Sequence, residues 1–221
     1  MKCFVRNVLI VFSLSLLVAC ERDEVVVKHV CEAVDLGLSV KWATCNIGAF
    51  APEEYGCYFA WGETTTKSTF GLDNYKWFTS LDNSYDYEDF TKYITEDHKT
   101  TLELSDDAAH VNWGGSWRMP TDAELTELRE QCTWTWTSQN GVNGYKVTSK
   151  SNGNSIFLPA AASYRDDSSS LNYAGRYGYY WSNSLYASNQ YHAWYVHFYS
   201  GDVLRDYHNR CYGYTIRPVC P

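Results

Sequence analysis

Short stretches of alternating apolar and polar residues run through most of the chain and are typical of half-buried β-strands. This alternation predicts a strand over residues 39–43, and an aromatic run predicts another over residues 57–61. Two further β-type segments, residues 145–148 and 156–158, flank an Asn-Gly dipeptide at 152–153. Because Asn-Gly is a favoured pair in tight turns, these segments predict a β-hairpin.

One helix is marked by its first turn and by its apolar spacing. Thr121 is followed three residues later by Glu124, the pattern of a capping box in which each side chain bonds the other residue's backbone N–H. Leu125, Leu128 and Cys132 then recur at helical spacing. The pattern predicts a helix that begins after Thr121 and turns these three residues toward the core.

A second, shorter helix is predicted to begin after Ser105. Its predicted core side consists of Ala108, Ala109 and Val111. Between the two helices, residues 113–117 read Trp-Gly-Gly-Ser-Trp, which predicts a turn with two large anchors. The polar, Tyr-rich stretch from about residue 70 to 101 lacks periodicity and is predicted to be an ordered surface loop region.

These elements predict one α+β domain that spans residues 34–221. Short strands alternate with only two helices, and no linker interrupts them. No sequence repeat of 20 to 50 residues recurs, so a solenoid or a propeller is not supported. Disorder is excluded because 45% of the 221 residues are hydrophobic.

The first nineteen residues have the features of an export signal. Lys2 and Arg6 precede a short apolar run that ends at Ala19, directly before Cys20. This ending resembles the bacterial lipobox, in which the cysteine is lipidated and becomes the new N-terminus. We therefore predict a signal peptide over residues 1–19 and a lipid attached to Cys20; the alternative is an ordinary secreted protein with an incidental cysteine.

The residues directly after Cys20 indicate where in the cell the protein is located. Residues 21–24 read Glu-Arg-Asp-Glu, which looks like the acidic tetrapeptide that sends lipoproteins of Bacteroides-type bacteria to the outer face of the outer membrane. Residues 20–33 would then be the lipidated cysteine and a short tether. We predict an outer-membrane protein, anchored by its lipid and facing the cell exterior.

The charge balance excludes one class of partner. The chain has 18 Lys and Arg against 26 Asp and Glu, a formal net charge of −8, and no block of basic residues. Nucleic acid is therefore not an expected partner, because binding it requires basic residues that neutralise phosphates.

Six cysteines follow Cys20 and would meet an oxidising compartment. They are Cys31, Cys45, Cys57, Cys132, Cys211 and Cys220. No pair has the C-x-x-C spacing of zinc or redox sites, and the sequence alone does not fix the pairing. A bridge between Cys31 and Cys220 would join the first and last strands, and we hypothesise that pair.

Several strings together resemble a known protein family. They lie at residues 34–46, 58–64, 113–121, 178–182 and 216–219. They are similar to the Bacteroidetes lipoproteins called the Fibrobacter succinogenes major paralogous domain, over residues 34–219. The resemblance implies a C-type lectin-like fold, with a small twisted antiparallel sheet, two helices, long ordered loops and neighbouring terminal strands.

The chain also resembles, less closely, the variable proteins diversified by diversity-generating retroelements, which display hypervariable residues on that fold. Fold-level analogy does not fix function. The Glu-Pro-Asn and Gln-Pro-Asp signatures of calcium-dependent sugar binding are missing. Sugar binding through calcium is therefore disfavoured.

Motifs for catalysis and for cofactors are not found in the sequence. No G-x-S-x-G, H-E-x-x-H, P-loop or dinucleotide fingerprint occurs. The acidic pairs at 106–107 and 166–167 are interpreted as caps and solvated charges. The six histidines, at positions 29, 98, 110, 192, 197 and 208, lack the spacing of a metal site. We therefore predict a non-enzymatic protein with no cofactor and no metal.

One enzyme class remains as an alternative. Formylglycine-generating enzymes share the broad fold and use a reactive cysteine pair, for which Cys211 and Cys220 are the candidates. A structural disulfide is the commoner role for cysteines of exported proteins. A cysteine-dependent oxidase is therefore the least favoured of the functional hypotheses.

The composition of the C-terminal third favours recognition. Twelve of the 19 tyrosines lie between Tyr164 and Tyr214, and no Lys follows Lys150. This palette of Tyr, Ser, Asn, Asp, His, Gly and Arg resembles antibody loops, where rigid aromatic rings supply contact area. Mutation of only the adenines of Asn codons would produce a similar set, although a β-rich extracellular protein could acquire it without such diversification.

The alternation of side chains along one predicted strand, residues 194–199, indicates which of these polar and aromatic residues could bind a ligand. Trp194, Val196 and Phe198 share one face of residues 194–199 and are predicted to be buried; Tyr195, His197 and Tyr199 would stand on the outer face. The predicted ligand-binding residues are Tyr191, His192, Tyr195, His197, Tyr199, Tyr207, His208, Asn209 and Tyr212.

We expect a protein or a glycan ligand on this face; a structural or adhesive component of the cell envelope is the alternative. Replacement of Tyr195 and Tyr199 by Ala is expected to leave folding nearly intact, because both side chains are predicted to be exposed.

Overall fold

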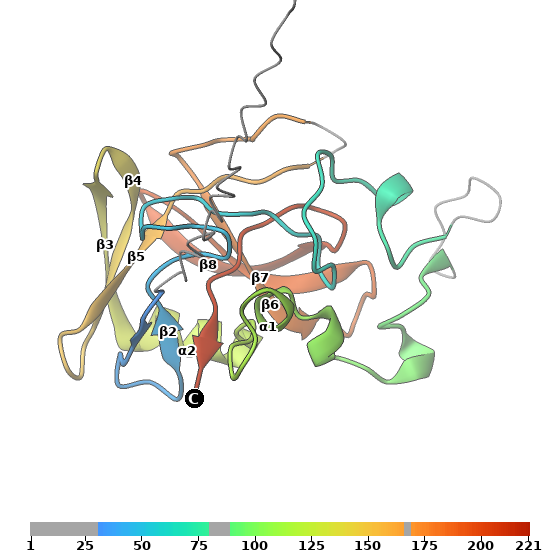
Figure 1. The fold of residues 1–221 in the computed structure, drawn as a ribbon, viewed down its shortest axis with the longest axis horizontal. Helices are drawn as coiled ribbons and strands as arrows, with labels where there is room; N and C mark the ends of the chain where they lie inside the picture. Colours follow the sequence, from blue (N-terminus) through green and yellow to red (C-terminus); the bar gives the residue numbers. More distant parts are fainter. Residues whose placement is uncertain (1–30, 80–88, 166–168) are drawn as a thin grey trace, which may run out of the picture.

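The structure, a computed structural model, describes residues 31–79, 89–165 and 169–221. Its two α-helices and small antiparallel sheets form an α+β fold, as the sequence predicts (Figure 1). The predicted signal peptide, Cys20 and most of the tether lie outside the described residues. Within the described ranges, no helix is both long and apolar enough to cross a bilayer.

The two ends of the domain meet in one sheet. Strand β2 (Lys41–Ala43) lies between β1 (Ala33–Val34) and β9 (Val219–Cys220), and both pairings are antiparallel. The C-terminus accordingly lies beside β2 (Figure 1). The expected proximity of the terminal strands is confirmed.

The hypothesised Cys31–Cys220 bridge is wrong, because the structure pairs Cys31 with Cys45. In the antiparallel register Ala33 faces Ala43, so Cys31 and Cys45 face each other two residues further on. Cys220 lies on the far side of β2, opposite Lys41. The intervening strand therefore separates the two cysteines that the sequence hypothesis joined.

The predicted β-hairpin is confirmed and belongs to a second sheet. Strand β4 (Val142–Ser149) pairs with β5 (Ser155–Pro159), and Thr148 faces Ser155 across the turn that contains Asn-Gly. The outer strand β3 (Cys132–Gln139) pairs with β4. Cys132 thus begins a strand, although the sequence analysis placed it on the preceding helix.

The third sheet is the central layer of the molecule. It consists of β6 (Gly178–Leu185), β7 (His192–Tyr199) and β8 (Asp202–Asn209), with β7 in the middle. One face packs on a hydrophobic cluster formed with α2, β4, β5 and the terminal sheet. The other face packs on a second cluster formed by long loops and α1. Both faces of this sheet are therefore covered over much of their length.

Helix α2 (Asp122–Gln131) begins as the sequence predicts. The Thr121 hydroxyl accepts a hydrogen bond from the Glu124 backbone N–H at 3.1 Å, and the Glu124 carboxylate accepts one from the Thr121 N–H at 2.7 Å. The predicted apolar face is also confirmed, because Leu125 and Leu128 are buried.

Helix α1 (Ala108–Trp113) buries Ala108 and Ala109, but Val111 is 50% exposed. The prediction for Val111 is wrong because two residues correspond to about 200° of helical rotation, which turns it away from Ala109. Gly114 and Gly115 follow in the predicted turn, whose two tryptophan rings, Trp113 and Trp117, contact each other at 5.1 Å.

Residues 57–61 do not form the predicted strand. They are largely buried, but they pair with the rest of the chain only through an isolated bridge from Phe59 to Tyr214. Their backbone N–H groups donate to separate segments: Cys57 to Ile47 and Trp61 to Arg210. The aromatic run marks a buried loop here, because a continuous apolar segment indicates burial and not a particular partner.

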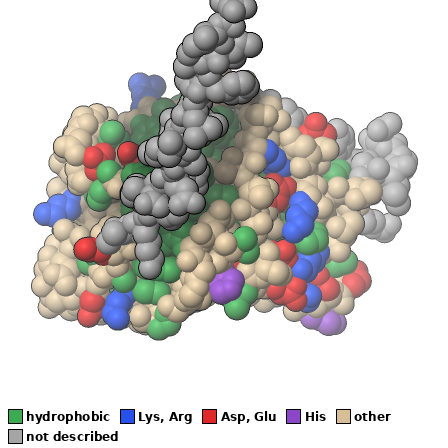
Figure 2. Space-filling model, viewed as in Figure 1, with side chains coloured by type: hydrophobic (Ala, Val, Ile, Leu, Met, Phe, Trp, Pro, Cys, Tyr) green, Lys and Arg blue, Asp and Glu red, His purple; other side chains and the backbone are tan. Residues whose placement is uncertain are grey.

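The described part of residues 70–106 includes the short 3-10 helices η1 (Leu72–Asn74), η3 (Thr95–Asp97) and η4 (Leu104–Asp106). The described part of residues 70–101 is a loop region, as predicted, but it is not confined to the surface, because Phe70, Tyr75, Phe78, Phe90 and Tyr93 are buried in the core. Residues 80–88 lie outside the described residues. On the face drawn in Figure 2, acidic and basic side chains are interspersed. No large patch of one sign appears on that face.

Candidate functional site

Strand β7 is buried on both faces, and this changes the predicted recognition surface. Val196 and Phe198 are buried, as predicted, but Tyr195 on the opposite face is only 3% exposed. The prediction of an outward-facing Tyr195 is therefore wrong. Alternation separates the two faces of a strand, but it does not show that loops cover the second face as well. Trp194 is half-buried, not fully buried as predicted.

The nine predicted ligand-binding residues divide among several environments. Tyr195 and Tyr212 are buried, and only Tyr199 and Tyr207 are clearly exposed, at 37% and 40%. The half-buried members are Tyr191, His192, His197, His208 and Asn209. The structure therefore does not bring the nine residues together as a single open patch.

Four of the nine lie in a continuous row of rings, here called the aromatic band. Its members are Tyr173, Tyr177, Tyr179, His197, Tyr195, His208 and Tyr212. Neighbouring ring centroids are 4.8 to 6.5 Å apart. The Arg165 guanidinium covers the band at its centre, 4.4 Å from the Tyr179 ring.

Burial decides the charge of the aromatic band. It raises the pKa of Tyr179 and of Tyr195, so both phenols stay neutral at physiological pH. Burial also lowers the pKa of His197, which the Asp206 carboxylate only partly opposes. The rings of Tyr179, Tyr195 and His197 are therefore neutral at physiological pH, and the Arg165 guanidinium lies over them as a positive charge.

A second set of rings, here called the outer cluster, lies on the other face of the same sheet. It consists of Tyr186, His192, Trp194 and Tyr207. Tyr186 and Tyr207 stack in parallel at 3.9 Å, and the Arg205 guanidinium lies 3.4 Å from the Trp194 ring centre. Two 2.7 Å hydrogen bonds to Asp122 hold Arg205 there. These rings mainly contact one another, which leaves Tyr207 as the exposed member.

The aromatic band reaches solvent at an open groove, here called the aromatic groove. Its volume is about 490 Å³, within the range of about 300–1,000 Å³ that is typical of small-ligand sites. The lining residues come from β3, β4, the loop before β6 and the β7–β8 turn. They are Trp136, Asn143, Tyr173, Gly175, Arg176, Tyr177, Tyr199 and Ser200.

Hydrogen bonds from side chains to backbone carbonyls fix the walls of the aromatic groove. The Asn143 amide donates to the Gly175 carbonyl at 3.1 Å, which ties the loop before β6 to β4. The Tyr145 hydroxyl donates to the Tyr199 carbonyl at 3.0 Å and ties the opposite wall to β4 as well. Both walls therefore depend on the same rigid hairpin, and the groove is formed before any ligand arrives.

Tyr173 has an unusual backbone for a large side chain. Its φ angle is 69°, in the left-handed region that favours glycine, and its side chain is 56% exposed. Such a conformation costs about 1 to 3 kcal/mol and persists only where its surroundings impose it. The Tyr173 carbonyl accepts hydrogen bonds from the Arg176 and Tyr177 N–H groups at 3.0 and 3.2 Å, and this turn imposes the conformation while the ring stays exposed.

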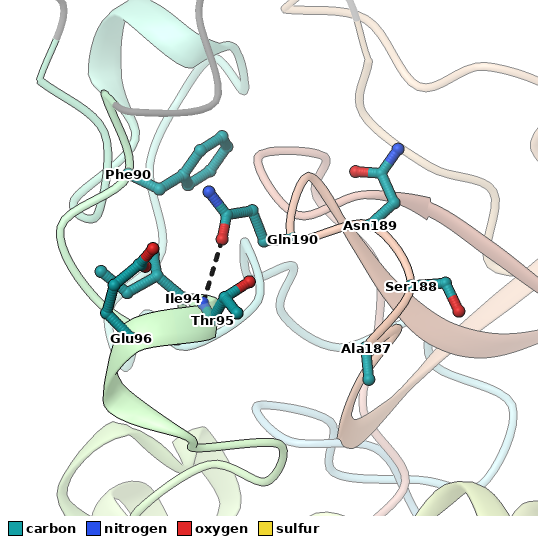
Figure 3. A pocket seen from close by; sticks show the side chains of 8 residues that line it. All are labelled: Phe90, Ile94, Thr95, Glu96, Ala187, Ser188, Asn189 and Gln190. Carbon is teal, nitrogen blue, oxygen red and sulfur yellow. Dashed lines mark hydrogen bonds between the residues drawn. The ribbon is translucent and has the colours of Figure 1, made fainter.

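A second groove of about 490 Å³ lies beside the β6–β7 turn (Figure 3). One wall contains Phe90 and the residues 94–96, and the other contains residues 187–190. The Gln190 Oε1 atom accepts a hydrogen bond from the Thr95 N–H at 3.2 Å and links the two walls. Its one aromatic side chain, Phe90, is buried, so this groove offers less open ring surface than the aromatic groove.

Two of the described candidates for chemistry, Asp106 and Asp107, have structural contacts. Asp107 caps α1 through the His110 N–H, and Asp106 pairs with Lys92 at 2.6 Å. Cys211 and Cys220 form no disulfide and are both buried. Among the described residues, no group of three or more His, Cys, Asp or Glu side chains gathers as a metal site. The pair at 166–167 and His29 lie outside the described residues.

Most residues of the aromatic groove were not predicted from the sequence. Tyr199 was predicted, and Tyr173 and Tyr177 belong to the Tyr-rich segment that the composition had marked. Trp136 and Asn143 had no such signal, because they are remote in sequence and reach the groove only through the fold.

Comparison with known proteins gives one family match. The model described as Domain of unknown function (DUF8237) matches residues 143–219. That region runs from the second residue of β4 to the first residue of β9 and includes every lining residue of the aromatic groove except Trp136. No curated protein and no solved structure matches the chain.

Proposed function

We propose that this chain is a non-catalytic binding domain that captures a protein or glycan ligand at the bacterial cell surface, with the aromatic groove as its main contact site. The observation that carries the proposal is the pair of open rings, Tyr173 and Tyr199, on opposite walls of a preformed groove. Rigid aromatic rings that are partly exposed supply large contact areas at low entropic cost.

The chemistry of the groove favours binding over catalysis. Its side chains are tyrosine, tryptophan, asparagine, serine and one arginine, so no carboxylate, imidazole or thiol among the lining residues is placed to act as a general base. The buried Tyr179 and Tyr195 support the groove from below through ring contacts. The buried rings of the aromatic band therefore support the groove, and the band contacts the ligand through Tyr173 and Tyr177.

The proposed architecture is a C-type lectin-like domain of the Bacteroidetes family whose strings the sequence resembles. Two features support this proposal: terminal strands that share a sheet through β2, and two helices beside an antiparallel central sheet. If the C-terminal segment is diversified, the changes would fall mainly on β7, β8 and the turn between them.

The proposed location is the outer face of the outer membrane, with a lipid attached to Cys20. Replacement of Cys20 by Ala is expected to abolish incorporation of a fatty-acid probe and to release the chain from the membrane fraction, because the thiol is the attachment atom. Metabolic labelling followed by fractionation measures both effects, with Cys31→Ala as the control that keeps its label. A Cys20→Ala chain that still carries the probe would contradict the proposal.

Binding at the aromatic groove can be tested with the full-length lipoprotein in detergent. The Tyr173→Ala, Tyr199→Ala double variant is expected to lose about thirtyfold in affinity, or about 2 kcal/mol, because two contact rings disappear. The probes are immobilised polysaccharides and extracellular-matrix proteins, measured by surface plasmon resonance.

The matched control is Tyr207→Ala in the outer cluster, which removes an equally exposed tyrosine on the other face of the sheet. It is expected to change affinity less than twofold. Binding that survives in the double variant but disappears in the Tyr207→Ala variant would move the site to the outer cluster and overturn the proposal.

A further inference from the structure

The aromatic groove contains one charged side chain, Arg176. Acidic residues outnumber basic ones in the whole chain, 26 to 18, yet none of them lines this groove. Asp202 faces Tyr199 across the β7–β8 pair but is not part of the lining. The lining of the groove therefore carries one positive charge, although the protein as a whole is acidic.

The Arg176 guanidinium is available for a ligand. Its side chain is exposed, and it forms no hydrogen bond or ion pair with the residues that the structure describes. Its backbone, in contrast, is fixed by a 3.0 Å hydrogen bond from its N–H to the Tyr173 carbonyl. A planar guanidinium on a fixed backbone is well suited to bind a carboxylate through two parallel hydrogen bonds.

The neighbouring rings indicate what carries that carboxylate. Tyr173 and Tyr199 are exposed, and Tyr177 contacts both of them, at 5.2 and 5.7 Å. The face of an aromatic ring carries negative potential and attracts the weakly positive C–H groups of a sugar ring. Several adjacent ring faces therefore fit the flat C–H face of a pyranose.

Uncommitted polar groups complete the lining. The Asn143 side-chain NH₂ group donates a hydrogen bond to the Gly175 carbonyl. Within the described residues, the Asn143 Oδ1 atom accepts no hydrogen bond. The exposed Ser200 hydroxyl lies on the opposite wall, in the β7–β8 turn. An amide oxygen and a hydroxyl are suitable partners for sugar hydroxyl groups.

We infer that the aromatic groove binds a saccharide that bears a carboxylate, such as a uronic acid or a sialic acid. The sugar ring stacks on Tyr173 and Tyr199, and the carboxylate pairs with Arg176. This inference rests on the proposed function and adds the class of ligand. A neutral sugar would use the rings but leave Arg176 without a partner.

The test uses three carboxylated probes and their methyl esters, which keep the sugar ring and remove the charge. The probes are trigalacturonate, trimannuronate and a sialylated trisaccharide, titrated by calorimetry into the full-length lipoprotein in detergent. At least one acid is expected to bind tenfold or more tightly than its ester. Arg176→Gln should remove that preference, and Tyr199→Ala should weaken both forms.

The charge control is Arg129→Gln, which removes an arginine on α2 remote from the groove residues and should change nothing. The inference is overturned if none of the three acids binds, if acid and ester bind equally, or if Arg176→Gln keeps the preference. If a neutral polysaccharide or a protein binds and depends on Tyr173 and Tyr199, the proposed function stands and only the ligand class is wrong. If no binding depends on these tyrosines, the proposed function itself fails.

Discussion

Replacement of Arg217 by alanine is expected to lower the free energy of unfolding by about 4 kcal/mol or more. The Arg217 side chain is fully covered, at 1% exposure, and donates to four oxygen atoms from separate segments. The acceptors are Asn46 Oδ1 at 2.9 Å and the carbonyls of Ala43, Thr44 and Phe157 at 3.0, 2.7 and 2.9 Å. Removal of the guanidinium takes away the donor that these four acceptors share.

The position of these acceptors explains why one arginine matters so much. Ala43 ends β2, Phe157 lies in the middle of β5, and Arg217 itself precedes β9. The guanidinium therefore joins the terminal sheet to the hairpin sheet. Burial lowers the pKa of Arg217 to about 10, so the group is still charged at physiological pH.

Urea unfolding followed by fluorescence measures the effect on Arg217. Arg129→Ala is the matched control, since this arginine is partly exposed and, among the described residues, its one ion pair is with Glu130 at 3.4 Å; a change within about 0.5 kcal/mol is expected. Arg217→Lys keeps the charge but has no planar fork, so it should also destabilise the protein. A loss below about 1 kcal/mol for Arg217→Ala would show that the buried bonds contribute little.

Replacement of Phe198 by alanine is expected to destabilise the protein by about 3 to 5 kcal/mol, because it leaves a cavity in the core. The ring is 0% exposed and contacts Trp134, Tyr145 and Tyr180 at 6.0, 5.3 and 5.7 Å between ring centroids. Gly178 lies so close that a Cβ atom there would overlap the ring. The site has little room to collapse around the missing side chain without moving two sheets.

Neighbouring positions on β7 supply the comparison for Phe198. Tyr199→Ala, next in sequence and 37% exposed, is expected to cost less than about 1 kcal/mol. Tyr195→Ala is now expected to cost about 3 kcal/mol, because its ring is buried against Trp181 and Tyr214. Equal stability of the Tyr195 and Tyr199 variants in urea would contradict the buried position of Tyr195.

Local signals predicted the elements that depend on neighbouring residues. The capping box at Thr121 and Glu124 and the hairpin around Asn-Gly were both confirmed, because each is determined by contacts within a few residues of the chain. The prediction of a strand over residues 57–61 was wrong for the opposite reason, because a strand depends on partners elsewhere in the chain. Their hydrophobic run indicated burial, but the partners of their backbone groups lie in other segments, at Ile47 before the run and at Arg210 and Tyr214 near the C-terminus.

The candidate site likewise has a part that could be predicted from the sequence and a part that depends on distant segments. Composition marked the Tyr-rich C-terminal third, and this region supplies Tyr173, Tyr177 and Tyr199. It could not show which tyrosines remain open, since a tyrosine can be buried with its ring packed or exposed with its ring as a contact surface. Tyr195 and Tyr199 share one face of β7, yet one is covered by loops and the other is not.

The α+β class, the start of α2, the β4–β5 hairpin and the region that holds the open tyrosines follow from local patterns in the sequence. Three other features depend on the folded chain: Cys31 pairs with Cys45, both faces of β7 are covered, and Trp136 and Asn143 join Tyr173 and Tyr199 around one groove. The two sets of features differ in the sequence distance over which the interactions act. Periodicity and capping act over a few residues, whereas the covering of a strand and the lining of a groove depend on segments that meet only after the chain has folded.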